Sequence, residues 1–174
     1  MEDRPLETQH LNLRRWRSED QKPFAAICAD PDVMRFIGDG STRTADQAAR
    51  AIDLFEKEWE ERGYGLFAVE LRLTGEFIGF TGFSRPDFLP VVLPSVEIGW
   101  RFGKAHWGRG YATEAARAAL AVGARAFADE EIVSICQVGN GASTRIMEKL
   151  GLDFDRRTID LTCGREVEVY RLSR

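Results

Sequence analysis

The sequence predicts an α/β (α+β) fold, a mixed sheet with helices packed on it. The first observation is the order of local patterns, β-α-α-β-β-β-α-β-α, followed by one or two strands. The second is an apolar strand that runs through a short glycine-bearing loop into an alanine-rich helix. The chain has 174 residues, 44% of them apolar and 30% charged, without a repeat or linker. We therefore expect one domain over residues 1–174.

The first half of the chain supplies the early elements of this order. Residues 11–14 alternate between apolar and polar and predict a first strand. A helix is expected to begin near Ser18 and to end at Pro31, and a second one spans 44–62 with one apolar stripe. Strands are expected at 66–71 and 76–83, joined by a turn at 73–75.

A proline-rich segment, residues 84–95, divides the two halves. Pro86, Pro90 and Pro94 predict a loop, although the segment is unusually apolar. Two interpretations stay open, a loop folded over the core and a surface that contacts substrate or another subunit. After it we expect a strand at 96–102, a helix from 111 to about 128, a strand at 132–138, a helix at about 142–150 and a strand at 165–172.

Composition excludes several classes of protein. The net charge of −4 disfavours nucleic-acid binding, and the basic Arg14, Arg15 and Arg17 are expected to form a solvated face. Three cysteines without CxxC spacing and two histidines argue against a disulfide framework, a metal site and Ser-His-Asp catalysis. The segment 1–7 has no apolar run, and no stretch of 18 apolar residues occurs. We therefore expect a cytoplasmic protein that does not bind membranes.

The glycine-bearing loop at 107–113 has the features of a phosphate-binding turn. The N-terminus of the helix that follows has unpaired N–H groups and the positive end of the helix dipole. Gly108 and Gly110 have no Cβ, so an anion can approach this backbone closely.

Three ordered segments carry a resemblance to a known family: residues 107–115 (WGRGYATEA), 140–151 (NGASTRIMEKLG) and 30–36 (DPDVMRF). Together they resemble the GNAT N-acetyltransferase superfamily, in particular the branch of ribosomal-protein N-terminal alanine acetyltransferases. The resemblance implies a mostly antiparallel central sheet with about four flanking helices. It also implies that the sheet splays open between its fourth and fifth strands, here 96–102 and 132–138.

The resemblance further implies a site for acetyl-CoA, used as a co-substrate without a metal. Trp107 could stack on it or only anchor the loop, and Asn140 and Ser143 could contact it or only cap a helix. Ala105 stands where the wider superfamily often has Gln or Arg, which suggests the narrower branch. The residues implied to bind acetyl-CoA are Ile98, Trp100, Phe102, Trp107, Gly108, Arg109, Gly110, Tyr111, Ala112, Thr113, Asn140, Ser143 and Arg145.

Glu97 is the candidate general base. It is a carboxylate in an otherwise apolar strand, and burial would raise its pKa towards neutrality. The competing interpretation is a rim residue paired with an arginine. No Tyr occurs at 152–162, where many superfamily members have their general acid, so Ser143 or a water molecule is left as the acid.

The expected function is direct transfer of an acetyl group from acetyl-CoA to a primary amine. The amine is either a protein N-terminal α-amine or that of a small molecule, and segments 34–44 and 84–95 are expected to select it. A non-catalytic acyl-CoA-binding or regulatory domain is the alternative. A nucleotide-binding domain is disfavoured because the phosphate-loop and dinucleotide motifs are missing.

The final strand, residues 166–172, is a candidate for pairing across a homodimer.

Overall fold

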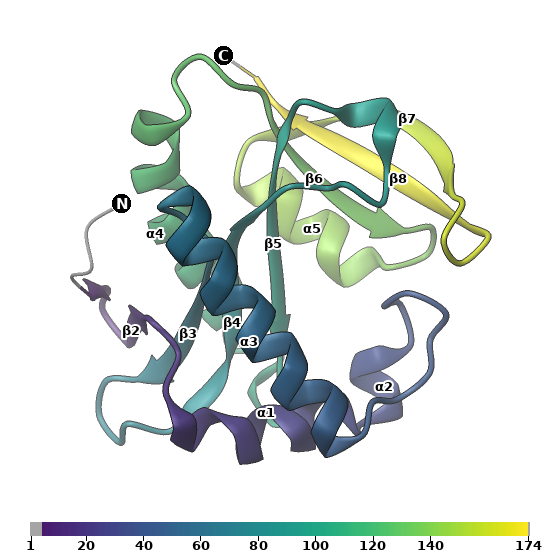
Figure 1. The fold of residues 1–174 in the computed structure, drawn as a ribbon. Helices are drawn as coiled ribbons and strands as arrows, with labels where there is room; N and C mark the ends of the chain where they lie inside the picture. The colour runs from purple at the N-terminus through teal and green to yellow at the C-terminus, as the bar shows by residue number, and fades with distance from the viewer. Residues whose placement is uncertain (1–4, 174) are drawn as a thin grey trace.

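The computed structural model describes residues 5–173 and contains one eight-stranded sheet, in the order β1-β2-β3-β4-β5-β6-β8-β7 (Figure 1). Residues 1–4, which begin the segment expected to carry no leader, lie outside the described residues. Neighbouring strands are antiparallel except β5 and β6, which are parallel. The strands are β1 Leu6–Glu7, β2 Leu11–Arg14, β3 Leu66–Leu71, β4 Phe77–Ser84, β5 Val96–Phe102, β6 Ile132–Gln137, β7 Leu152–Asp160 and β8 Arg165–Leu172.

Helices cover both faces of the sheet, as Figure 1 shows for α3 on the near face. Helices α1 and α3 pack together with β3 and β4 around an aromatic cluster, whereas α4 and α5 pack around the larger core on the opposite face. Thr44 and Gln47 form a reciprocal capping box that begins α3. The helices are α1 Gln21–Cys28, α2 Pro31–Met34, α3 Ala45–Arg62, α4 Tyr111–Ala126 and α5 Gly141–Lys149.

The expected mixed, mostly antiparallel sheet is confirmed, and the sheet opens between β5 and β6. These two strands pair at only two positions, Val96 with Ile132 and Glu97 with Val133. One further link follows, from the Ser134 hydroxyl to the carbonyl of Ile98 at 2.8 Å. Beyond that point the rest of β5 has no partner in β6, so its last residues are free to line a cavity.

Two expectations for the early and late elements are wrong, and one short strand was not predicted. Pro31 does not end the first helix, because α1 ends at Cys28 and Pro31 is the first residue of α2, where proline's missing N–H costs nothing. The short β1 was not expected. The final strand cannot pair across a homodimer, because β6 and β7 occupy both of its edges.

The proline-rich segment folds over the core. Leu89 and Val92 are buried against valines of β6 and β8, and Pro90–Val92 forms one turn of 3-10 helix. Phe88, Val91 and Leu93 remain exposed on its outer side. The inward side chains therefore fold over the core, as the first interpretation expects. The outer side chains are exposed and could contact substrate or another subunit.

The expected solvated basic face near the N-terminus is wrong for Arg14. Its side chain is 6% exposed, and its guanidinium donates to Asp20 at 2.7 and 2.8 Å and to Glu70 at 2.6 Å. Arg15 pairs with Glu56 at 2.7 Å. Glu70 and Glu56 lie 56 and 41 residues from their arginines, so charge counting could not find these two pairs.

Gly123 marks a close contact between α4 and the sheet. A Cβ at this position would lie 2.1 Å from Cζ of Phe83. Gly123→Ala is therefore expected to lower the free energy of unfolding by about 1–3 kcal/mol through overpacking, despite the better helix propensity of alanine. Urea unfolding measures this, with exposed Ala124→Gly as a control that is expected to cost about 1 kcal/mol. A more stable Gly123→Ala protein would contradict the packing described here.

Candidate active site

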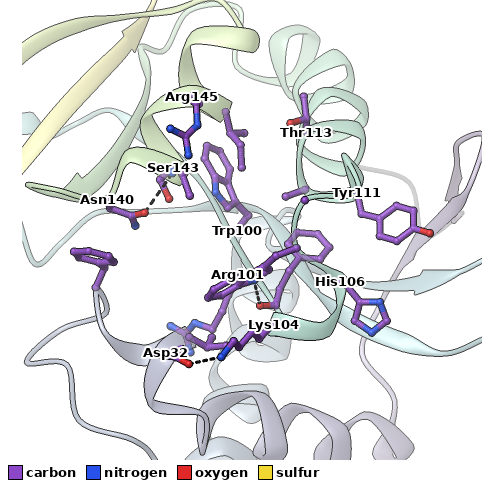
Figure 2. Close-up of a pocket in the computed structure, with 18 of the residues that line it drawn as sticks. Asp32, Trp100, Arg101, Lys104, His106, Tyr111, Thr113, Asn140, Ser143 and Arg145 are labelled. Atoms are coloured by element: carbon purple, nitrogen blue, oxygen red, sulfur yellow. Dashed lines mark hydrogen bonds and ion pairs between the residues drawn. The ribbon is translucent and has the colours of Figure 1, made fainter.

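A cavity of about 610 Å³ lies at the carboxyl end of β5, where the sheet opens. The loop before α4 and the first turn of α4 form one wall, and α5 forms another. Residues of α2 and of the segment after it close the third side. Figure 2 shows Trp100 near its centre, with Asn140, Ser143 and Arg145 on one side and Asp32, Arg101 and Lys104 on the other.

The glycine turn has the backbone geometry that an anion site requires. Gly108 and Gly110 have φ of +72° and +84°, a region that residues with a side chain rarely adopt. A Cβ at either position would meet no atom within 4 Å, so the space above the turn is open. Gly110 is the N-cap of α4 and provides no side chain to its first turn. The helix N-terminus therefore faces the cavity uncapped.

Trp107 is anchored and exposed at the same time. Its indole Nε1 donates to the carbonyl of Phe102 at 2.8 Å, which ties the loop to the end of β5. The ring is still 48% exposed, and it lines the cavity. The position of Trp107 is therefore compatible with stacking on acetyl-CoA and with anchoring the loop.

The α5 side of the cavity carries polar groups. Asn140 is the N-cap of α5, and its Oδ1 accepts from the backbone N–H of Ser143 at 3.3 Å. The Ser143 hydroxyl makes no hydrogen bond within residues 5–173, so capping does not occupy it. Arg145 is exposed and forms no ion pair in the described part of the chain.

Most of the residues implied to bind the cofactor come together here, but two of them, Ile98 and Arg109, do not line the cavity. The candidate base Glu97 does not line it either. Ile98 is fully buried in the main core. The residues that do line it are Trp100, Phe102, Trp107, Gly108, Gly110, Tyr111, Ala112, Thr113, Asn140, Ser143 and Arg145. Sequence reasoning missed Arg101, Lys104, His106, Ala142, Ile146 and Lys149.

Glu97 lies where β5 and β6 separate. It is half-buried, and its carboxyl group forms no hydrogen bond or ion pair with any described residue. The interpretation as a rim residue paired with an arginine is therefore wrong. Burial raises the pKa of Glu97 from its ordinary 4.5 to about 8. A carboxyl group with such a pKa can exchange a proton near neutral pH.

The family follows from comparison with known proteins. The sequence model of the "Acetyltransferase (GNAT) domain" family matches residues 10–153. The chain belongs to the GNAT acetyltransferase family. This assignment makes the protein an acyltransferase, as the residues of the glycine turn and of α5 suggested.

Relatives of this GNAT protein agree with the assignment. "Uncharacterized protein YkkB" of Bacillus subtilis is 32% identical over 154 residues, covering 87% of this chain and 86% of its own. "Uncharacterized N-acetyltransferase YoaA" of the same organism is 29% identical over 146 residues, covering 84% and 81%.

Solved structures share the fold of this GNAT domain. An acetyltransferase from Agrobacterium tumefaciens has a TM-score of 0.80 at 25% identity, covering 98% of this chain and 95% of its own. RimL, a ribosomal L7/L12 α-N-protein acetyltransferase in complex with coenzyme A, has a TM-score of 0.76 at 13% identity, covering 97% of both chains. At that identity the RimL match concerns the fold alone.

Two kinds of feature are missing from residues 5–173. No helix there combines the length and the apolar character needed to cross a membrane. No group of three or more His, Cys, Asp or Glu side chains there is placed to hold a metal ion.

Proposed function

We propose that this GNAT domain transfers an acetyl group from acetyl-CoA directly to a primary amine, with residues 1–174 acting as a single domain. The observation that carries the proposal is the uncapped N-terminus of α4 behind Gly108 and Gly110, which faces an open cavity. Such a turn can bind a pyrophosphate through backbone N–H groups. Thr113 is placed to add a hydroxyl contact, and Arg145 to add a charged one.

The chemical step needs an amine that has lost its proton. The amine nitrogen forms a bond to the thioester carbonyl carbon, the carbon–sulfur bond breaks, and CoA leaves as a thiolate. Glu97 would accept the amine proton through a water molecule, because its side chain does not line the cavity. The unpaired Ser143 hydroxyl, or a water molecule, would protonate the thiolate.

The acceptor is either a protein N-terminal α-amine or a small-molecule amine. An α-amine has a pKa of about 8, so roughly a tenth is neutral at pH 7, and it needs little help from a strong base. The alternative, a non-catalytic acyl-CoA-binding domain, is disfavoured by the unpaired Glu97 with its raised pKa. Amine-independent, slow hydrolysis of acetyl-CoA would favour that alternative.

A thermal-shift titration with acetyl-CoA, CoA, NAD and ATP tests the cofactor site. At a hundred times its Kd, a ligand stabilises the folded protein by about 2.7 kcal/mol. We expect stabilisation by acetyl-CoA and CoA and none by NAD. No shift with acetyl-CoA or CoA would reject the site.

Arg145→Ala is expected to weaken acetyl-CoA binding by about 10-fold, because it removes one charge-assisted hydrogen bond to a phosphate. Isothermal titration calorimetry measures the Kd. Arg125→Ala is the matched control, since Arg125 is exposed in the last turn of α4 and does not line the cavity. Equal affinities of the two variants would exclude Arg145 from the cofactor site.

A further inference from the structure

Arg101 is a cation without a carboxylate partner among the described residues. Its Nη1 donates to Sγ of Cys28 at 3.5 Å, and its Cζ lies 5.3 Å from the centre of the Phe80 ring. Its Nε is buried and has no hydrogen-bond partner in residues 5–173, and its Nη2 makes no hydrogen bond there. Burial lowers the pKa of this guanidinium, but an arginine stays charged at ordinary pH.

Arg14 shows how the same fold satisfies a buried arginine. Two carboxylates, Asp20 and Glu70, surround the Arg14 guanidinium at hydrogen-bond distance. Leaving a charge without such partners is costly, so the protein retains one only where something else supplies the opposite charge. The unpaired edge of Arg101, formed by Nε and Nη2, has the geometry that binds a carboxylate or a phosphate with two hydrogen bonds.

Two cavities meet at Arg101. One is the cavity of the candidate active site, and the other, of about 310 Å³, lies between α1 and α3. The second cavity is also lined by Arg43 and Arg50 and by no Asp or Glu of the described residues. Arg43 has one exposed acidic neighbour, Asp39, at 3.8 Å. An excess of positive charge around a hollow attracts anions, which is notable in a chain of net charge −4.

The position of Arg101 separates it from the proposed cofactor contacts. In Figure 2, Arg101 lies on the α2 side of Trp100, across the cavity from Ser143 and Arg145. Side chains alternate along a strand, so Arg101 shares a face of β5 with Glu97. Gly99 lies between them, and a Cβ there would meet no atom within 4 Å. The face that joins the proposed base to Arg101 is therefore open at its centre.

We propose that the acceptor amine carries an anionic group, a carboxylate or a phosphate, that binds the Nε–Nη2 edge of Arg101 beside Arg43. The inference rests on the proposed function, because it assigns the acceptor of that reaction. The amine end of the acceptor then lies towards Glu97, and its anionic end lies towards α1 and α3.

Matched pairs of amines test the proposal through the rate of CoA release. Alanyl-glutamate amide against alanyl-glutamine amide varies a carboxylate, and O-phosphoethanolamine against ethanolamine varies a phosphate. We expect the anionic member of at least one pair to have a kcat/KM about 10- to 100-fold higher, the range of a charged hydrogen bond. The pair that shows the preference identifies the anion.

Arg101→Gln is expected to abolish this preference and to leave the Kd for acetyl-CoA unchanged. Arg101→Lys is expected to restore part of the preference, because it keeps the charge but not the paired donors. Arg125→Gln is the control and should keep the full preference. Arg101→Gln should fold, since it removes an unpaired charge, whereas Arg14→Gln should be strongly destabilised. A wild-type protein without preference, or an Arg101→Gln variant that retains it, would overturn the proposal.

Equilibrium titrations of the same four amines in the presence of CoA separate this proposal from the proposed function. If no amine is acetylated but the anionic amines still bind about 10-fold tighter in an Arg101-dependent way, the proposed reaction fails and the anion site stands. If neither rates nor affinities distinguish the members of either pair, the anion site is rejected, whatever the activity towards other amines.

Discussion

Gly110→Asp is expected to abolish the stabilisation of this protein by acetyl-CoA. The φ of +84° disfavours any side chain at this position, and a new side chain would enter the open space above the turn. The aspartate carboxylate would then lie next to the proposed pyrophosphate. Two like charges about 4 Å apart near a protein surface repel by about 4 kcal/mol, close to 1,000-fold in Kd. Calorimetry and a thermal-shift titration with acetyl-CoA measure the loss.

Gly164→Asp is the matched control for this substitution. Gly164 has a φ of +72° in the turn between β7 and β8, and a Cβ there would also meet no atom within 4 Å. The control should therefore cost similar backbone strain while acetyl-CoA binds normally. If Gly110→Asp kept its acetyl-CoA shift, the pyrophosphate would not lie on this turn.

Glu97→Gln is expected to lower kcat by about 10²–10⁴-fold, the usual contribution of a general base, and to leave the Kd for acetyl-CoA unchanged. Since an α-amine acceptor also titrates near pH 8, the informative quantity is the ratio of wild-type to variant kcat/KM. With the pKa of Glu97 at about 8, this ratio should rise with pH and level off above 8. Glu166→Gln, an exposed residue of β8, is the control. A ratio that does not change with pH would remove Glu97 from the mechanism.

The raised pKa of Glu97 also predicts how the free energy of unfolding changes with pH. The folded protein holds the Glu97 proton up to about pH 8, while the unfolded chain releases it near its ordinary 4.5. Stability therefore falls as pH rises between these values, by at most about 1.4 kcal/mol per pH unit. Glu97→Gln removes this loss, so the variant should be more stable than the wild type at pH 8 and lose the advantage near pH 4. Urea unfolding at the two pH values measures it, and an advantage of equal size at both would contradict the raised pKa.

Local sequence patterns predicted the central part of the fold well. The turn at 108–110 was predicted because glycine is needed for its positive φ, and the helix that follows was predicted by its alanines. Thr44 was the predicted start of α3 and is its N-cap. Each of these features depends on residues within one or two turns of one another.

The second-last strand, β7, was less visible in the sequence. It carries charged residues at Asp153, Asp155, Arg156 and Arg157, and its register shifts between Phe154 and Arg156. A bulge moves side chains to the other face, so the alternation that marks a strand is interrupted. Pairing with β8, the next strand of the chain, stabilises β7.

Local patterns in the sequence predicted most of the elements from β2 onwards, the glycine turn before α4 and the choice of Glu97 as the base to test. Which charges have partners depends on the assembled fold. It pairs Arg14 with Asp20 and Glu70, and it leaves Glu97 and Arg101 without any carboxylate or guanidinium partner in the described residues. Arg14 and Glu70, for example, lie 56 residues apart in the chain and meet only when strands β2 and β3 pair. The sequence shows which residues are ionisable, but the burial of a group and its distance to other charges set its pKa and its pairing.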